Sequence, residues 1–186
     1  TQVTPLGTYF LSIKDNDPVL SNKAVREAIS LAINRKELCS TVLNGAAEPA
    51  SSFLNPSVPG HDDKLKTYEH NVKKAKQVLA DAGISNPTFT CKVRQKEEKI
   101  ATALQAYLKE AGITMNVETT DAGIWSSARA AGELQATVLG WFPLYADADN
   151  QMYTYYYSEN AVGKGVFYNN PEFDSLMKEA RESNDS

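Results

Sequence analysis

Apolar residues recur three and four positions apart in several segments of the chain, which predicts amphipathic helices. The clearest stripe lies in residues 22–33, after a Ser-Asn pair typical of a helix N-cap, and consists of Val25, Ala28, Ile29, Ala32 and Ile33. Similar spacing predicts helices over residues 34–43, 71–83, 97–111 and 124–131. Two further helices are expected over residues 147–157 and 173–181.

Short runs rich in β-branched and aromatic residues predict strands over residues 8–13, 88–93, 113–118 and 135–141. From residue 88 onward strands and helices alternate, which is the order of βαβ units. The chain is therefore expected to form an α/β fold with a largely parallel sheet flanked by helices. Residues 45–70, which contain three prolines, predict a long irregular segment that is either functional or packed along a surface.

Residues 134–150 (LQATVLGWFPLYADADN) contain the strongest functional signal. A buried strand ends there in a loop of aromatic and acidic residues: Trp141, Phe142, Tyr145, Asp147 and Asp149. In open α/β sheets ligands bind beyond the carboxyl ends of strands, in pockets lined by apolar rings and a few polar groups. The stretch therefore predicts a ligand-binding wall. The alternative is that Trp141 and Phe142 belong to the core.

The sequence offers little catalytic or metal-binding chemistry. It contains neither a glycine-rich phosphate loop nor a nucleophile elbow. Asp147 and Asp149 could hold a cation together with Asn150 and Asp121, but such a pair more often forms a turn or helix cap. The segment 61–63 (His-Asp-Asp) lacks the third group that a triad or zinc site requires.

Composition narrows the possible partners further. The 186-residue chain has a net charge of −4, which argues against a nucleic-acid partner. No apolar run approaches the roughly 20 residues of a membrane span, and Thr1 opens into polar sequence without a signal peptide. Cys39 and Cys91 are expected to be buried free thiols, with a single disulfide as the alternative. His61 and His70 are expected at the surface.

A dense tyrosine cluster lies at positions 153, 155, 156 and 157. One helix cannot bury that many tyrosines on a single stripe, so part of the cluster is expected to face solvent or a partner. We expect the cluster to pack against residues 45–70. A contact surface is the alternative.

Four segments together resemble one family, the extracellular solute-binding proteins (family 5) of peptide ABC transporters, which include oligopeptide-, dipeptide- and nickel-binding receptors. Residues 22–35 (NKAVREAISLAINR) and 71–83 (NVKKAKQVLADAG) are similar to its helix motifs. Residues 140–150 (GWFPLYADADN) and 168–174 (YNNPEFD) are similar to two further motifs. The segments occur in the family's order and span nearly the whole chain.

The resemblance implies that residues 1–186 form a single lobe, the distal or C-terminal one, of a larger two-lobed receptor with a type II periplasmic-binding-protein-like fold. Such receptors close around a ligand by hinge motion. The implied function is the substrate-binding component of an ABC importer that captures peptides or similar small solutes, with no enzymatic activity and no cofactor. The implied partners are the ligand and the permease subunits. The receptor would be a monomer in the periplasm or on the cell surface, attached to the membrane by a lipid anchor or only through the permease.

The resemblance also assigns site residues. Trp141 corresponds to the family's cleft tryptophan, and Trp125 lies near another cleft aromatic. Phe142, Tyr145 and Asp147 would complete this wall. Leu144 departs from the pattern, because peptide receptors commonly carry an aspartate there that pairs with the α-ammonium of the peptide.

Val138 stands where some family members have an arginine, which is a second departure from the pattern. Two other classes of function compete with solute binding. An enzyme lobe of the same fold would have to use Asp147 and Asp149. A sensory or interaction module would use the tyrosine cluster.

Overall fold

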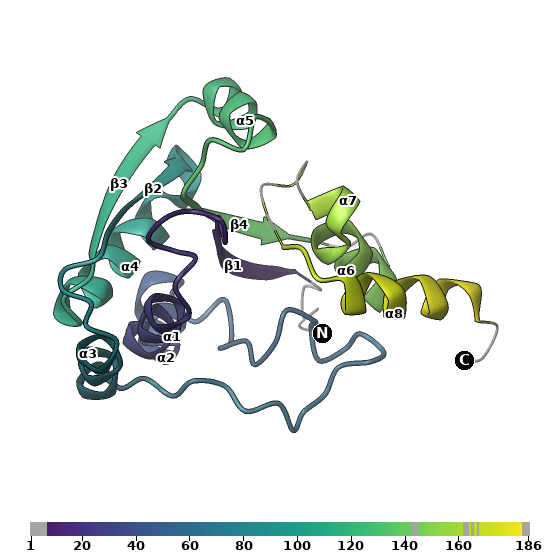
Figure 1. Cartoon of the computed structure of the whole chain (residues 1–186), viewed down its shortest axis with the longest axis horizontal. Coiled ribbons are helices and arrows are strands. Elements are labelled where there is room, and N and C mark those ends of the chain that lie inside the picture. The colour runs from purple at the N-terminus through teal and green to yellow at the C-terminus, as the bar shows by residue number, and fades with distance from the viewer. Residues whose placement is uncertain (1–6, 143–144, 162–163, 165, 167, 184–186) are drawn as a thin grey trace.

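The computed structural model describes residues 7–142, 145–161, 164, 166 and 168–183. Their strands form one four-stranded sheet in the order β1-β4-β2-β3 (Figure 1). The strands are β1 (Thr8–Ile13), β2 (Thr88–Arg94), β3 (Thr114–Thr120) and β4 (Ala136–Trp141).

The sheet is mixed. β2 is parallel to both β3 and β4, as the alternating pattern predicted. The edge strand β1 instead runs antiparallel to β4, with Tyr9 opposite Gly140. An α-helix lies in each connection between the parallel strands, α4 between β2 and β3 and α5 between β3 and β4. β1 is instead followed by the long connection to β2. No such crossover joins β1 to its neighbour β4, so the direction of β1 is not fixed in this way.

The predicted helices are present with small shifts at their ends. They are α1 (Lys23–Ala32), α3 (Val72–Asp81), α4 (Glu98–Glu110), α5 (Ala122–Ala130), α6 (Ala148–Tyr156) and α8 (Pro171–Glu182). Asparagine or aspartate side chains cap most of their N-termini, at positions 22, 71, 121, 147 and 170.

Two shorter helices differ from the expectation. The helix expected over residues 34–43 is a single turn, α2 (Arg35–Glu37), followed by a π-helical turn (Leu38–Val42). The turn α7 (Ser158–Ala161) had no sequence signal. None of the described helices is long and apolar enough to cross a membrane.

The sheet separates two hydrophobic cores. The larger one lies under α1, α3 and α4, and Val138 of β4 belongs to it. The smaller one is rich in aromatic residues and contains Trp125, Leu139 and Tyr155. Because successive residues of a strand point to opposite faces, Val138 and Leu139 divide β4 between the two cores.

A buried hydrogen-bond network joins the loop after β1 to the sheet. Asp17 accepts bonds from the backbone N–H groups of Val19 (2.9 Å) and Leu20 (3.1 Å). Its other carboxylate oxygen accepts from Gln135 Nε2 at 2.8 Å. Gln135 Oε1 in turn accepts the N–H of Thr90 at 2.8 Å. The network therefore ties the start of α1 to β2 and β4.

Residues 45–70 lack regular structure, as predicted, and follow a wide path past α1 before they return to α3 (Figure 1). His70 is exposed, as expected. The prediction for His61 was wrong, because its side chain is buried. The His61 ring holds this segment together through contacts with Leu54 O (2.8 Å) and Ser52 Oγ (3.3 Å). Local folding of the segment, which hydropathy does not reveal, causes this burial.

The two cysteines are free and buried, which confirms the first of the two predictions. Burial raises the pKa of the Cys91 thiol to about 12. Both thiols therefore act as small apolar groups in the core.

Candidate functional site

The candidate site begins where β4 ends. Helices α6, α7 and α8 gather beyond the arrowhead of this strand, and α8 extends away from the sheet (Figure 1). All residues of α8 are described, and none of them is buried. The chain after β4 therefore leaves the sheet toward solvent. The carboxyl end of a parallel strand is the usual position of a ligand site in an α/β sheet.

The two adjacent aromatic residues at the end of β4 have different environments. Trp141 is half-buried, and its ring lies 5.0 Å from the ring of Tyr155 in an edge-on arrangement. Phe142 is 53% exposed and contacts Tyr9, with 5.6 Å between ring centroids. Trp141 therefore packs against the smaller core, whereas Phe142 faces solvent. The alternative that both residues belong to the core is therefore wrong for Phe142.

Tyr9 and Phe142 form an exposed ring pair over Gly140. Tyr9 is 48% exposed, and Tyr145, three residues beyond Phe142, is 55% exposed. A Cβ atom on Gly140 would lie 2.7 Å from Tyr9 Cε1 and 3.1 Å from Phe142 Cε2. Only glycine lets both rings approach the strand this closely. Large exposed aromatic side chains at such a position suit contact with a ligand or partner.

Sequence reasoning missed Tyr9. Its position in the site depends on the antiparallel register of β1, which places it opposite Gly140. The only signal in the sequence was a tyrosine at the start of a predicted strand, and that signal does not identify a neighbour. Pairing between distant strands is what brings this side chain to Phe142.

Trp125 lies apart from the ring pair. It is only 3% exposed, and its Nε1 donates a hydrogen bond to Thr137 Oγ1 at 3.0 Å. The guanidinium groups of Arg94 and Arg129 lie 4.2 Å and 5.3 Å from the centre of its ring. Side chains of the protein itself enclose this ring, so Trp125 has a packing role.

Asp147 has a local structural role. Its side chain caps α6 by accepting the N–H of Asp149 at 2.8 Å. This confirms the helix-cap interpretation of the acidic pair. The described residues include no group of three or more His, Cys, Asp or Glu side chains that could hold a metal ion. Leu144, the remaining predicted site residue, lies outside the described residues, as does Pro143.

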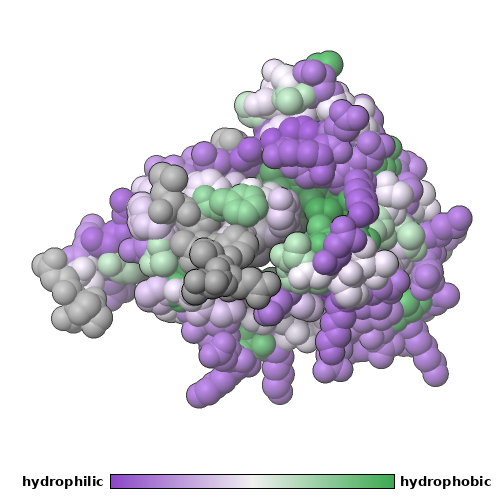
Figure 2. Space-filling model, turned by 180° about the vertical axis from the view of Figure 1, so that it is seen from behind, coloured by the Kyte–Doolittle hydropathy of each residue, from purple (hydrophilic) through white to green (hydrophobic). Residues whose placement is uncertain are grey.

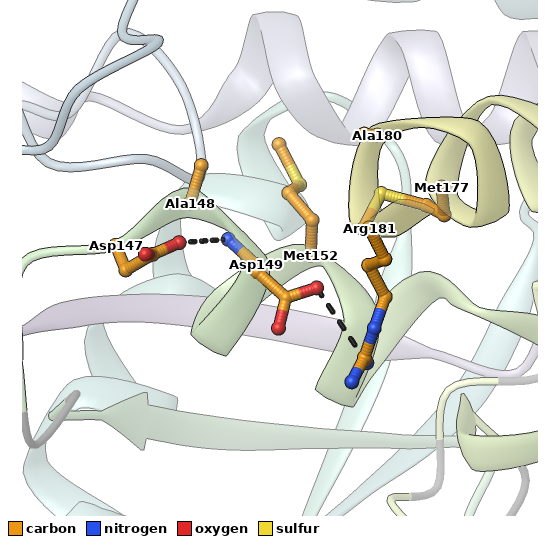
Figure 3. Close-up of a pocket in the computed structure, with 7 residues that line it drawn as sticks. All are labelled: Asp147, Ala148, Asp149, Met152, Met177, Ala180 and Arg181. Atoms are coloured by element: carbon orange, nitrogen blue, oxygen red, sulfur yellow. Dashed lines mark hydrogen bonds and ion pairs between the residues drawn. The ribbon is translucent and has the colours of Figure 1, made fainter. Parts of the chain in front are cut away.

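A pocket of about 510 Å³ lies between α6 and α8 (Figure 3). Met152 of α6 and Met177 of α8 line it from the two helices, and Asp147 is the predicted site residue that borders it. The Asp149 carboxylate points toward Arg181 and lies 3.6 Å from its guanidinium. The ring pair and this pocket are therefore lined by different residues.

The tyrosine cluster packs largely within the protein. Phe53, from the irregular segment 45–70, contacts Tyr155 and Tyr156 with ring centroids 5.6 Å and 5.0 Å apart. This confirms the expected packing against that segment. Tyr153 and Tyr157 stack on one another at 4.7 Å. Burial raises the pKa of Tyr156 to about 12, so this phenol stays neutral.

The face of the molecule opposite to that in Figure 1 combines apolar and polar regions. Figure 2 shows hydrophobic surface gathered in a hollow that hydrophilic residues border. The eight residues 139–146 (LGWFPLYA) carry no Asp, Glu, Lys, Arg or His. The arrangement can therefore supply apolar and ring contacts to a bound molecule. Residues 139–146 supply no charged side chain, and Asp147 is the first charged residue after them.

The sequence matches the family described as bacterial extracellular solute-binding proteins, family 5 Middle, over residues 1–163. Oligopeptide-binding protein AppA of Bacillus subtilis is 30% identical over 97% of this chain and 37% of its own length. Heme-binding protein A of Haemophilus influenzae is 26% identical over 94% of this chain and 34% of its own length. The chain thus spans about a third of these curated relatives.

Solved structures agree with the sequence match. The ABC transporter-associated periplasmic binding protein DppA from Helicobacter pylori, in complex with the peptide STSA, is 28% identical and superposes with a TM-score of 0.92. The alignment covers 98% of this chain and 37% of that one. This similarity confirms the expected type II periplasmic-binding-protein fold. Because the family match covers residues 1–163, most of this chain, the chain belongs to the bacterial extracellular solute-binding proteins of family 5.

Proposed function

We propose that this chain is the ligand-binding lobe of a substrate-binding component of an ABC importer, and that it captures peptides or similar small solutes. The observation that carries the proposal is the exposed ring pair of Tyr9 and Phe142 at the carboxyl end of β4. Solved relatives contain bound peptides, among them DppA with the peptide STSA and AppA with a nonapeptide. The relatives named here are binding proteins rather than enzymes.

In this proposal residues 1–186 form one lobe, the distal one, of a two-lobed receptor. The chain spans about a third of its curated relatives, which leaves room for a second lobe in proteins of their size. The ring pair would form one wall of a cleft between the lobes, together with Tyr145 and the exposed part of Trp141. Closure of the second lobe would bury these rings and supply much of the binding free energy.

The lobe would bind the ligand mainly by apolar and ring contacts. Residues 139–146 carry no carboxylate, and the Asp147 carboxylate caps α6. Leu144 cannot pair with an ammonium group. We therefore expect a ligand whose group nearest Leu144 is uncharged, such as a blocked or internal part of a peptide.

The remaining parts of the proposal follow from the family. The receptor would deliver its ligand to permease subunits and act as a monomer in the periplasm or on the cell surface, free or lipid-anchored. It would need neither a cofactor nor nucleic acid.

Enzymatic activity is the competing class of function, with Asp147 and Asp149 as its acidic groups. Incubation of the receptor with a peptide, followed by mass analysis, should return the peptide intact. Cleavage would favour the enzyme.

The Leu144→Asp variant of the two-lobed receptor tests the ligand chemistry. The new carboxylate should strengthen binding of a peptide with a free α-amino group by about 1–3 kcal/mol, through a charge-assisted hydrogen bond. It should weaken binding of the N-acetylated form of the same peptide, because a buried carboxylate without a partner is unfavourable.

The measurement is a calorimetric titration of both peptide forms against both proteins. Leu144→Asn is the matched control, because it adds a polar group of the same size without the charge and should not distinguish the two forms by more than about 1 kcal/mol. Equal affinities in all combinations would show that position 144 does not face the ligand's terminus.

A further inference from the structure

Four buried polar side-chain atoms in the described part of the chain have no hydrogen-bond partner, and all of them lie between residues 141 and 151. They are Trp141 Nε1, Asp149 Oδ1, Asn150 Oδ1 and Gln151 Oε1. Arg181 compensates the charge of Asp149 at 3.6 Å. Buried polar groups in proteins are nearly always paired, so the unpaired atoms of Trp141 and Gln151 require an explanation.

Gln151 is the most unusual of these residues. It is a polar side chain with 0% exposure on α6. Its Nε2 makes only a long contact to Phe53 O, at 3.5 Å, and its Oε1 makes none. A buried amide oxygen left unpaired costs about 1–3 kcal/mol. An apolar side chain of the same length at position 151 would avoid this cost. The presence of a glutamine therefore points to a polar group that pairs with its amide oxygen.

Trp141 and Gln151 have the same neighbour. The ring of Trp141 lies 5.0 Å from the ring of Tyr155. Gln151 precedes Tyr155 by four residues in α6, so the two side chains lie on the same face of the helix. Phe53, which contacts the amide of Gln151, also contacts Tyr155 at 5.6 Å. An unpaired donor and an unpaired acceptor thus lie around one aromatic ring.

A group that pairs with both atoms must accept a hydrogen bond from Trp141 Nε1 and donate one to Gln151 Oε1. A water molecule does both, whereas an ammonium group only donates and a carboxylate only accepts. Both atoms are shielded from solvent, which excludes contact with a ligand at the surface. Buried waters bind to such otherwise unpaired groups.

We propose that one buried water molecule bridges Trp141 Nε1 and Gln151 Oε1 and fixes the orientation of the Trp141 ring at the end of β4. Gln151 is then a positioning residue, which acts through the water on a tryptophan at the end of β4. This inference is independent of the ligand and of the proposed transport function.

Nuclear magnetic resonance of the ¹⁵N-labelled, ligand-free protein tests the proposal, because the chain has only two tryptophans. Trp125 is an internal reference, since its Nε1 donates to Thr137 Oγ1 at 3.0 Å. Its indole signal is assigned by Trp125→Phe. We expect a cross-peak between the Trp141 indole proton and a long-lived water, and none for Trp125.

The Gln151→Met variant keeps the length of the side chain and removes the acceptor. It should abolish the water cross-peak of Trp141, shift that indole proton upfield and leave the Trp125 signal unchanged. Gln105→Met is the matched control, because it removes an amide on α4 that donates to the backbone O of Met115 on β3. It should leave both indole signals unchanged.

Two results would overturn the proposal. One is the absence of a water cross-peak at Trp141 in the unsubstituted protein, a measurement that stands even where Gln151→Met fails to fold. The other is a cross-peak that persists in a folded Gln151→Met variant. Either result would leave the proposed transport function untouched.

Discussion

The carboxylate of Asp17 is predicted to contribute strongly to the stability of the folded chain, and Asp17→Asn tests this prediction. The substitution keeps one oxygen, which can still accept the N–H groups of Val19 and Leu20. It replaces the other oxygen with an NH₂ group that faces Gln135 Nε2, so two donors meet where the native bond is 2.8 Å. Gln135 cannot reverse its amide without losing the N–H of Thr90.

The expected loss is about 2–3 kcal/mol at pH 7. It comprises one hydrogen bond to a charged group in a buried position, worth about 1.5–3 kcal/mol, and a new unpaired donor. Burial alone would raise the pKa of Asp17, but hydrogen bonds from Gln135, Leu20 and Val19 outweigh it, so the pKa lies below its ordinary 3.8.

The lowered pKa fixes the pH dependence of this contribution. For a carboxyl group whose pKa is lower in the folded state, the stabilisation is present above the unfolded pKa and is lost as the pH falls through the folded pKa. The difference between the two proteins should therefore be constant near neutral pH and shrink below about pH 4.

The assay is urea unfolding followed by circular dichroism, at pH 7 and at several values below pH 4. Asp15→Asn is the matched control two residues away, because burial raises the pKa of Asp15 despite the opposing effects of Arg26 and a backbone hydrogen bond. Removing that carboxylate should be neutral or slightly stabilising at pH 7. A change within about 0.5 kcal/mol for Asp17→Asn at pH 7 would refute the reasoning, since surface substitutions have effects of that size.

Three further predictions concern α8 and the two thiols. Arg181 lies 3.8 Å over the ring of Tyr153 and pairs with Asp149, so Arg181→Met should speed hydrogen exchange of the α8 amides several-fold; equal rates in this variant and in the control Glu182→Gln would contradict that role. Cys39 and Cys91 are free, so a reducing agent should leave the melting temperature unchanged, whereas a fall of several degrees would indicate a disulfide. The Cys91 pKa of about 12 is raised by burial, so its contribution to stability should be present below pH 9 and decline at higher pH.

Much of the fold could be predicted because its signals are local. The caps at Asn22 and Asn71 and the apolar stripes that follow them depend on residues close in sequence. The alternation of strands and helices after residue 88 likewise predicted the parallel pairing of β2 with β3 and β4. The position of Phe142 just past the end of β4 followed from the same pattern.

The features that were missed depend on contacts between distant segments. Tyr9 reaches the site only because β1 runs antiparallel to β4. Trp125 is enclosed by Thr137 and two arginines that come from β2 and α5. His61 is buried because residues 52–63 fold back on themselves. Hydropathy describes a residue's tendency to be buried, but it cannot specify which neighbours a long-range pairing supplies.

The proposed function is tested most directly by peptide binding to the proposed two-lobed receptor and to its Tyr9→Ala/Phe142→Ala variant, measured by native mass spectrometry with a mixed tetrapeptide library. We expect peptide adducts on the unsubstituted receptor and at least tenfold weaker binding by the variant, because truncation of aromatic anchors commonly costs about 1–3 kcal/mol. Ile124→Ala removes an exposed apolar side chain on α5 and is the control that should retain affinity. Equal affinity in all three proteins, or a receptor that forms no peptide adduct, would contradict the proposed binding of peptides by the Tyr9 and Phe142 rings.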